Sequence, residues 1–177
     1  VRLVEDALPV TGTEAVDLRV ASGRVLAADV VASRDNPALD ISAMDGYAVT
    51  AGVPNGGAAK GGWVTDGVAA AGSAPATLDD PSRCIEIATG APLPRGADTV
   101  VPVEAVGVDG PRVTLRGAAD VQPGRHVRHR GSHYRRGDKL LSRGTRLSSA
   151  HIAVLASEGY ETVTVYGAPR VGLLSSG

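Results

Sequence analysis

The spacing of apolar residues near the N-terminus predicts two short elements. In residues 14–20 apolar and polar positions alternate, which predicts a strand. In residues 25–31 the spacing is closer to a helical period, and it predicts a helix that ends before Asp35-Asn36-Pro37. The residue before a proline disfavours the helical region, so this tripeptide marks a boundary. Residues 1–8 are expected to hold the last turns of another helix.

The C-terminal part predicts one helix and two strands. Ser148 and Ser149 can cap a helix over Leu147–Glu158, and Gly159 stands where a C-cap glycine belongs. The apolar face of this helix is expected at Ile152, Leu155 and Ala156. β-Branched residues then favour strands at Thr162–Tyr166 and Arg170–Leu174.

The middle of the chain lacks any helical period. Residues 51–82 are rich in Gly, Ala, Ser and Pro, which favours short strands and tight turns. Asp109-Gly110 is a strong hairpin signal. Further strands are expected at Cys84–Ala88, Thr99–Val106 and Arg112–Leu115.

These patterns together predict a mixed α+β protein with two domains. Residues 1–40 and 130–177 are expected to form one discontinuous α/β domain. Residues 41–129 are expected to form an inserted, mostly-β domain. The composition agrees with a folded chain, because 43% of the 177 residues are hydrophobic and 21% are charged.

Net charge and cysteine content exclude several classes of protein. A net charge of −1 argues against nucleic-acid or membrane-surface binding by bulk charge. No apolar run approaches the ~20 residues that a membrane helix needs. The single cysteine, Cys84, cannot form an intramolecular disulfide, and its apolar surroundings favour a buried, inert thiol over a nucleophile. A cytoplasmic location is expected.

The first stretch with candidate chemistry is Leu39–Val49. It brings two carboxylates, Asp40 and Asp45, close to a serine, a glycine and a tyrosine. Such an acidic loop suits a divalent cation, or a carboxylate that activates a hydroxyl or water. A turn capped by Asp40 and Ser42 explains the same residues, and spacing alone favours that alternative.

The second stretch is Ile87–Asp98, where a strand ends in Thr89-Gly90 before a Pro-x-Pro loop. Backbone N–H groups at a glycine turn, with a threonine hydroxyl, can bind a phosphate or another oxyanion. A proline-stiffened structural loop is the alternative, and the motif alone favours it.

The third stretch is Gly124–Asp138, which contains five arginines. Guanidinium groups can donate paired hydrogen bonds to an oxyanionic ligand, whereas a solvated basic loop is the equally weighted alternative. A metal site is not favoured, because repelling arginines surround its three histidines, His126, His129 and His133.

Taken together, the three stretches resemble one known family. Ser42-Ala43-Met44-Asp45-Gly46-Tyr47, Thr89-Gly90-Ala91-Pro92 and Arg128-x-Arg130-Gly131-Ser132 resemble the N-terminal part of the molybdopterin molybdenumtransferases, the MoeA and gephyrin E-domain family. The resemblance covers essentially the whole chain. It implies the first two domains of an elongated, four-domain homodimer.

The resemblance also implies an activity. Members insert molybdate into adenylylated molybdopterin, in molybdenum cofactor biosynthesis, with Mg²⁺ or another divalent cation assisting. Asp45 and Thr89 are then the expected catalytic residues, and Asp45 is also the expected metal ligand. The expected ligand- and anion-binding residues are Ser42, Gly90, Arg128, Arg130, Gly131 and Ser132. Arg128 and Arg130 are expected to face a cleft with Asp45 and Thr89, where a guanidinium would keep Asp45 ionised.

Two positions depart from the family pattern. His133 stands where the family usually has an aspartate, and Ile41 where it usually has an asparagine. A lost carboxylate removes a candidate cation ligand. Two other roles therefore stand beside the enzyme: a non-catalytic molybdopterin-binding paralogue, and a scaffold for dimerisation or partner recruitment.

Overall fold

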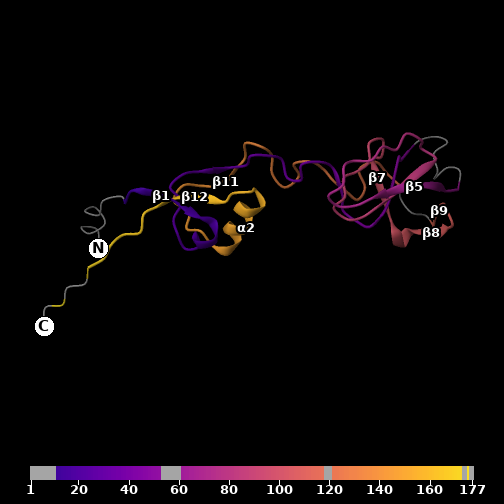
Figure 1. Ribbon diagram of the computed structural model, residues 1–177. Coiled ribbons are helices and arrows are strands. Elements are labelled where there is room, and N and C mark those ends of the chain that lie inside the picture. Colours follow the sequence, from indigo (N-terminus) through magenta and orange to yellow (C-terminus); the bar gives the residue numbers. More distant parts are fainter. Residues whose placement is uncertain (1–10, 53–60, 118–120, 173–174, 176–177) are drawn as a thin grey trace. The chain divides into compact units, whose positions relative to one another are not determined.

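The computed structural model describes residues 11–52, 61–117, 121–172 and 175. The chain divides into two compact units, one of residues up to Arg34 and from Arg136 onward, the other of Asp35–Arg135 (Figure 1). The domain boundaries expected at 40/41 and 129/130 stay a prediction. Among the described residues, no helix is long and apolar enough to cross a membrane.

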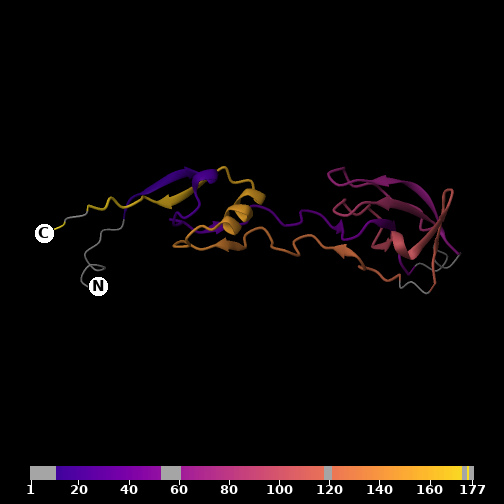
Figure 2. The ribbon, with the colours of Figure 1, turned by 90° about the horizontal axis from the view of Figure 1, so that it is seen from below.

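The first unit is built on antiparallel strand pairs that join distant parts of the chain. β1 pairs with β12 along five residues, and β2 pairs with β11 (Figure 2). Leu18, Leu155 and Val165 belong to its buried core, so the helix and the β1–β12 pair share one apolar interior. The elements are β1 (Thr13–Asp17), the 3-10 turn η1 (Leu18–Val20), β2 (Val30–Val31), β11 (Lys139–Leu141), α2 (Ser149–Ser157) and β12 (Thr162–Tyr166).

Helix α2 confirms the expectation for the C-terminal part. The Ser148 hydroxyl accepts a hydrogen bond from the His151 N–H, and the His151 ring accepts one from the Ser148 N–H, which together close a capping box. Gly159 follows with a φ of 86°, which suits a glycine after a helix. Ile152 and Leu155 pack on the core as predicted, whereas Ala156 is exposed.

The helix predicted over residues 25–31 is wrong. Val25 forms a bridge to Arg146, Leu26 forms one to Val165, and Val30–Val31 is the strand β2. Pairing with partners more than a hundred residues away outweighs a weak local period, and the β-branched valines suit it.

Two further strand predictions for this unit need correction. The strand predicted to run through Leu18–Val20 ends at Asp17, whose carboxylate accepts the Arg19 N–H and starts the 3-10 turn. Residues 170–172 form no strand, and the rest of that predicted strand, like the helix at 1–8, falls outside the described residues. The described chain is thus mostly β with one short α-helix, less helical than expected.

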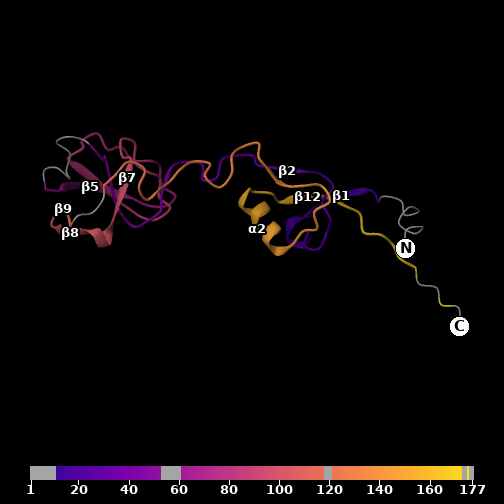
Figure 3. The same cartoon turned by 180° about the vertical axis from the view of Figure 1, so that it is seen from behind.

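The second unit is a six-stranded sheet with a small strand pair beside it. The sheet order is β7-β4-β6-β5-β9-β8, and β3 pairs with β10 separately. The neighbours β8 and β9 lie side by side in Figure 3. The strands are β3 (Ile41–Ser42), β4 (Gly46–Val49), β5 (Trp63–Ala69), β6 (Arg83–Ile87), β7 (Thr99–Pro102), β8 (Val106–Asp109), β9 (Arg112–Leu115) and β10 (Val127–Arg128).

Most of the strand predictions for this unit are confirmed. β6 and β9 lie where they were expected, and β8 and β9 form the hairpin that Asp109-Gly110 indicates. The single strand predicted over Thr99–Val106 is interrupted by the 3-10 turn η2 (Val103–Ala105). Residues 63–69 form a seven-residue strand, longer than the short strands expected within residues 51–82.

The sheet buries side chains on both faces. Tyr47, Val49 and Cys84 lie in one apolar cluster, and Ala48 and Ile85 lie in another, as strand alternation requires. Burial raises the pKa of Cys84 to about 11, so the thiol stays protonated and unreactive at neutral pH.

Candidate functional site

The centre of the candidate site is a hydrogen-bonded pair, Asp45 and Thr89. Thr89 donates its backbone N–H to Asp45 Oδ1 at 2.7 Å and its hydroxyl to the same oxygen at 2.8 Å. These two bonds, the backbone one first, lower the pKa of Asp45 below its ordinary value. Asp45 is therefore ionised at neutral pH, and its Oδ2 accepts no hydrogen bond from the described residues.

Strand register brings the pair together. Asp45 precedes β4, in which Gly46 pairs with Ile87, and Thr89 follows β6 two residues after Ile87. Gly46 lies so close to β7 that an added Cβ would stand 2.1 Å from the Val101 carbonyl oxygen. Only glycine fits there, and its close approach places Asp45 at the end of the sheet.

Ser42 and Gly90 hold the loop that carries Asp45. Ser42 is 1% exposed, and its hydroxyl donates to the Met44 carbonyl at 2.5 Å and accepts from the Met44 N–H. The Gly90 N–H donates to the Ser42 carbonyl at 2.9 Å. Both donors are engaged inside the protein, and the expected role of these residues in ligand binding stays a prediction.

A hollow of about 170 Å³ opens beside Asp45. Two of the residues that line it, Glu86 and Val68, were missed by the sequence analysis. The sequence does carry a signal for Glu86, because it is the one charged residue in the otherwise apolar run 84–88. The lining residues are Asp45, Gly46, Tyr47, Val68, Glu86, Ile87, Ala88 and Val103.

The basic loop makes different contacts. The Arg130 N–H donates to Asp40 Oδ1 at 2.7 Å, and the Arg130 guanidinium pairs with Asp35 at 2.6 Å. His129 Nδ1 lies 3.3 Å from Asp40 Oδ2. The Arg130 N–H, and then His129, lower the pKa of Asp40. The expectation that a guanidinium keeps Asp45 ionised is therefore wrong, because Thr89 lowers the pKa of Asp45 and Arg130 pairs with Asp35.

The remaining residues of the basic loop are placed separately. Arg128 is exposed in β10, opposite Ile41, and forms no ion pair with the described residues. The Gly131 N–H donates to the Pro37 carbonyl, and the Ser132 N–H to the His129 carbonyl. His133 Nδ1 lies 3.2 Å from Asn36 Oδ1. No hydrogen bond between described residues joins this loop to Asp45, and a shared cleft stays a prediction.

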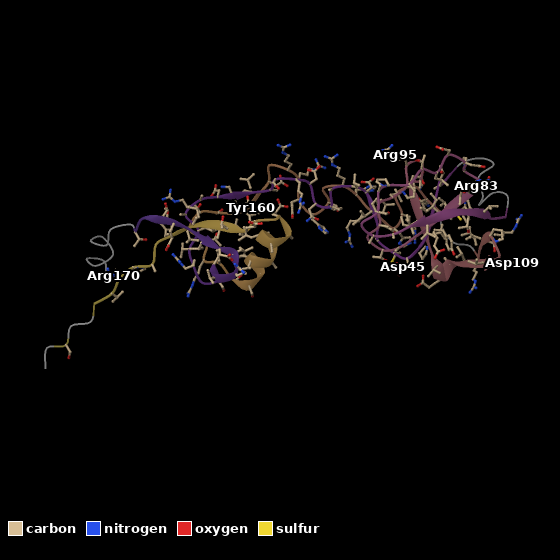
Figure 4. All side chains as sticks on the ribbon, viewed as in Figure 1. Asp45, Arg83, Arg95, Asp109, Tyr160 and Arg170 are labelled. Atoms are coloured by element: carbon tan, nitrogen blue, oxygen red, sulfur yellow. The ribbon has the colours of Figure 1, made fainter. Side chains whose placement is uncertain are left out.

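Figure 4 shows that the far end of the loop that follows Thr89 is also separated from Asp45. Arg95, at the far end of the Pro-Leu-Pro-Arg segment, lies on the opposite edge of the sheet unit from Asp45 in this view. In the described part of this loop, Thr89 is the residue that is hydrogen-bonded to the Asp45 side chain.

A metal ion held by the protein alone is not supported. Among the described residues, no three His, Cys, Asp or Glu side chains come together closely enough to hold one. The free Oδ2 of Asp45 does fit Mg²⁺ in its usual protein setting, where one or two carboxylates, waters and substrate phosphates share the coordination.

Comparisons with known proteins decide the family. The model of the MoeA N-terminal region (domain I and II) matches residues 1–159. The chain belongs to this family. MoeA relatives include a molybdopterin molybdenumtransferase of Nostoc, 39% identical over 93% of this chain and 38% of that protein. The molybdopterin molybdenumtransferase 2 of Mycobacterium tuberculosis is 35% identical over 99% of this chain and 44% of that protein.

Solved structures agree with the sequence comparison. The crystal structure of a molybdopterin biosynthesis moeA protein from Pyrococcus horikoshii OT3 matches with a TM-score of 0.81 and 31% identity. The match covers 93% of this chain and 43% of that one. The chain thus has the fold of the MoeA N-terminal region, and it spans about two fifths of the length of the relatives that it matches.

Proposed function

We propose that the chain is the N-terminal part of a molybdopterin molybdenumtransferase, which inserts molybdate into adenylylated molybdopterin. The observation that carries this proposal is the Asp45–Thr89 pair, found in a chain of the MoeA N-terminal family. An ionised carboxylate with one locked and one free oxygen is suited to hold a cation or to orient a water.

Asp45 and Thr89 have separate tasks in this proposal. Thr89 fixes the carboxylate by donating two hydrogen bonds to Oδ1, so Oδ2 already points in one direction before the substrate binds. No rotational entropy of the carboxylate then has to be lost during the reaction. Asp45 Oδ2 would hold Mg²⁺, which when bound supplies positive charge beside the adenylyl phosphate. The exposed Arg128 is the proposed contact for oxyanionic charge.

The remaining parts of the reaction are assigned to the rest of the protein. Relatives are more than twice as long as this chain, and we propose a homodimer in which other domains complete the site. His133, a residue of the basic loop, is hydrogen-bonded to Asn36, whereas the Asp45 carboxylate is hydrogen-bonded to Thr89. Its departure from the family pattern therefore need not affect Asp45.

The test is a chimera in which this chain replaces the matching part of the Nostoc relative. The proposal expects AMP release and molybdate insertion by the chimera, with the Asp45→Asn variant at least about a hundredfold slower. Asp109→Asn, the same change at the exposed tip of the β8–β9 hairpin, is the matched control and should leave the rate unchanged.

A folded, dimeric chimera that binds molybdopterin and inserts no molybdate would overturn the enzyme proposal. It would favour a non-catalytic paralogue or a scaffold. The His133→Asp variant then tests the cause, because restored insertion would assign the lost activity to that residue.

A further inference from the structure

One row of side chains crosses four strands of the sheet and ends beside the hollow. Val68 of β5 pairs with Glu86 of β6, Glu86 pairs with Tyr47 of β4, and Tyr47 pairs with Val101 of β7. Residues directly opposite each other on neighbouring strands project to the same face. Glu86 and Tyr47 are therefore adjacent side chains on one face, and both line the hollow.

The Tyr47 hydroxyl is a polar group without a protein partner. The residue is only 7% exposed, yet its hydroxyl forms no hydrogen bond with the described residues. Among the described residues the one buried side-chain polar atom without a hydrogen-bond partner is Trp63 Nε1, so the Tyr47 hydroxyl itself reaches solvent and is open to a hydrogen bond from outside the protein. The hollow that Tyr47 lines is where a partner for the hydroxyl can be supplied.

Glu86 adds an uncompensated negative charge to the same hollow. Its carboxylate is exposed and forms no ion pair with the described residues. Asp45, also in the lining, is ionised and likewise lacks a cationic partner among them. Two carboxylates repel an oxyanion unless a cation lies between them and it, so the Glu86 end of the hollow, away from the cation proposed at Asp45, does not suit molybdate or phosphate. It suits a group that donates hydrogen bonds.

The walls of the hollow are apolar and exposed. Val68 is 71% exposed and Val103 is 47% exposed, and Ile87 and Ala88 complete the lining. Valine side chains that project into water beside polar groups offer a surface against which a flat ring can lie. A volume of about 170 Å³ suits a single heterocyclic ring system better than a whole nucleotide.

We propose that Glu86 and Tyr47 bind the edge of a planar nitrogen heterocycle, with N–H donors facing Glu86 and a ring acceptor facing Tyr47. The 2-aminopyrimidine edge of a pterin has this alternation of donors and acceptors. The inference deepens the proposed function, because molybdopterin carries a pterin, and it makes Glu86 and Tyr47 specificity residues. Burial, followed by the charge of Glu86, raises the pKa of Tyr47, which keeps its hydroxyl protonated as a donor.

The test is binding of free pterin to the 177-residue chain, followed by pterin fluorescence. Lumazine is the matched probe, because a carbonyl replaces the 2-amino group and would face Glu86 with an acceptor. Pterin should bind at least about tenfold more tightly than lumazine, and Glu86→Gln should remove most of that preference. Tyr47→Phe, which deletes only the hydroxyl, should weaken pterin binding about three- to tenfold.

Glu104→Gln is the control variant, because Glu104 is exposed on η2 and lies outside the lining of the hollow. Its pterin affinity should match that of the unchanged chain. Three results would overturn the inference: no pterin binding, equal binding of pterin and lumazine, or an unchanged pterin preference in Glu86→Gln.

These outcomes are independent of the test of the proposed function. A chimera that inserts molybdate, together with a chain whose pterin affinity is unaffected by Glu86→Gln, would disprove only the heterocycle site. An inactive chimera with the expected pterin preference would disprove only the enzyme.

Discussion

Thr89 donates two hydrogen bonds, from its backbone N–H and its hydroxyl, to a single oxygen of Asp45. The two residues are 44 positions apart in sequence and meet because β4 and β6 are neighbours. One oxygen of the carboxylate is thereby fixed, and the other is available to a ligand. This asymmetry makes Asp45 more than the turn residue that its sequence context favours.

Removing the Thr89 hydroxyl should raise the pKa of Asp45. Thr89→Val keeps the backbone N–H and the side-chain shape, so the carboxylate loses one of its two stabilising bonds. The pKa, followed by NMR titration of the Asp45 carboxyl, should move toward the ordinary value of 3.8. In the chimera the rate should fall about tenfold, because Oδ1 is held less firmly.

Thr50→Val is the control for this change. The Thr50 hydroxyl donates to the Gly96 carbonyl, away from Asp45, so its removal should leave the Asp45 titration unchanged. An Asp45 pKa that is identical in Thr89→Val and the unchanged chain would refute the assigned cause.

Asp40 should contribute to stability only above acid pH. Its pKa is lowered in the folded state by the Arg130 N–H and then by His129, so the folded protein prefers the ionised form. That contribution is complete above the ordinary pKa of 3.8 and is lost as the pH falls through the lowered folded value. Asp40→Asn should therefore reduce the free energy of unfolding at pH 7.

The same variant should also flatten the fall in stability below about pH 4, as measured by urea denaturation at several pH values. Asp79→Asn, at an exposed aspartate elsewhere in the unit, serves as the comparison. If the free energy of unfolding falls equally steeply with acid pH in both variants, Asp40 is not the cause of that fall.

Gly46→Ala should destabilise the sheet unit strongly. The new Cβ would stand 2.1 Å from a backbone oxygen of Val101, and backbone in the sheet cannot move away cheaply. We expect a loss of about 2–3 kcal/mol in the free energy of unfolding. Thermal and urea denaturation measure it.

Gly107→Ala provides the matched comparison within the same sheet. Its Cβ would meet its nearest neighbour, the Thr114 hydroxyl, at 3.5 Å, an ordinary contact. The change should cost less than about 1 kcal/mol. Similar losses for the two variants would contradict the argument from close approach.

Ser148→Ala should weaken helix α2. The Ser148 hydroxyl accepts the His151 N–H and half of the capping box depends on it, so its loss should cost about 1 kcal/mol. Ser149→Ala changes the first residue inside the helix, where alanine is the better helix former, and should be neutral or slightly stabilising. Circular dichroism during denaturation distinguishes the two, and equal losses would argue against the cap.

The sequence by itself determined the elements whose signals are local. Ser148 and Gly159 mark the two ends of α2, Asp109-Gly110 marks the β8–β9 hairpin, and β-branched residues mark the strand Thr162–Tyr166. These features depend on residues within one turn or one strand, so the neighbouring residues in the sequence are sufficient to predict them. The motifs around Asp45, Thr89 and Arg130 likewise sufficed to suggest the family that the comparisons confirm.

Tertiary structure decided what depends on distant partners. Val25–Val31 pairs with residues near the other end of the chain and so forms bridges and a strand, although its local period is helical. The partners of the site residues were decided in the same way. Register places Thr89 beside Asp45 and Glu86 beside Tyr47, while the β3–β10 pair brings Arg130 to Asp40 and Asp35. A hydrogen bond requires two groups within about 3 Å, and only the folded sheet specifies which groups meet at that distance.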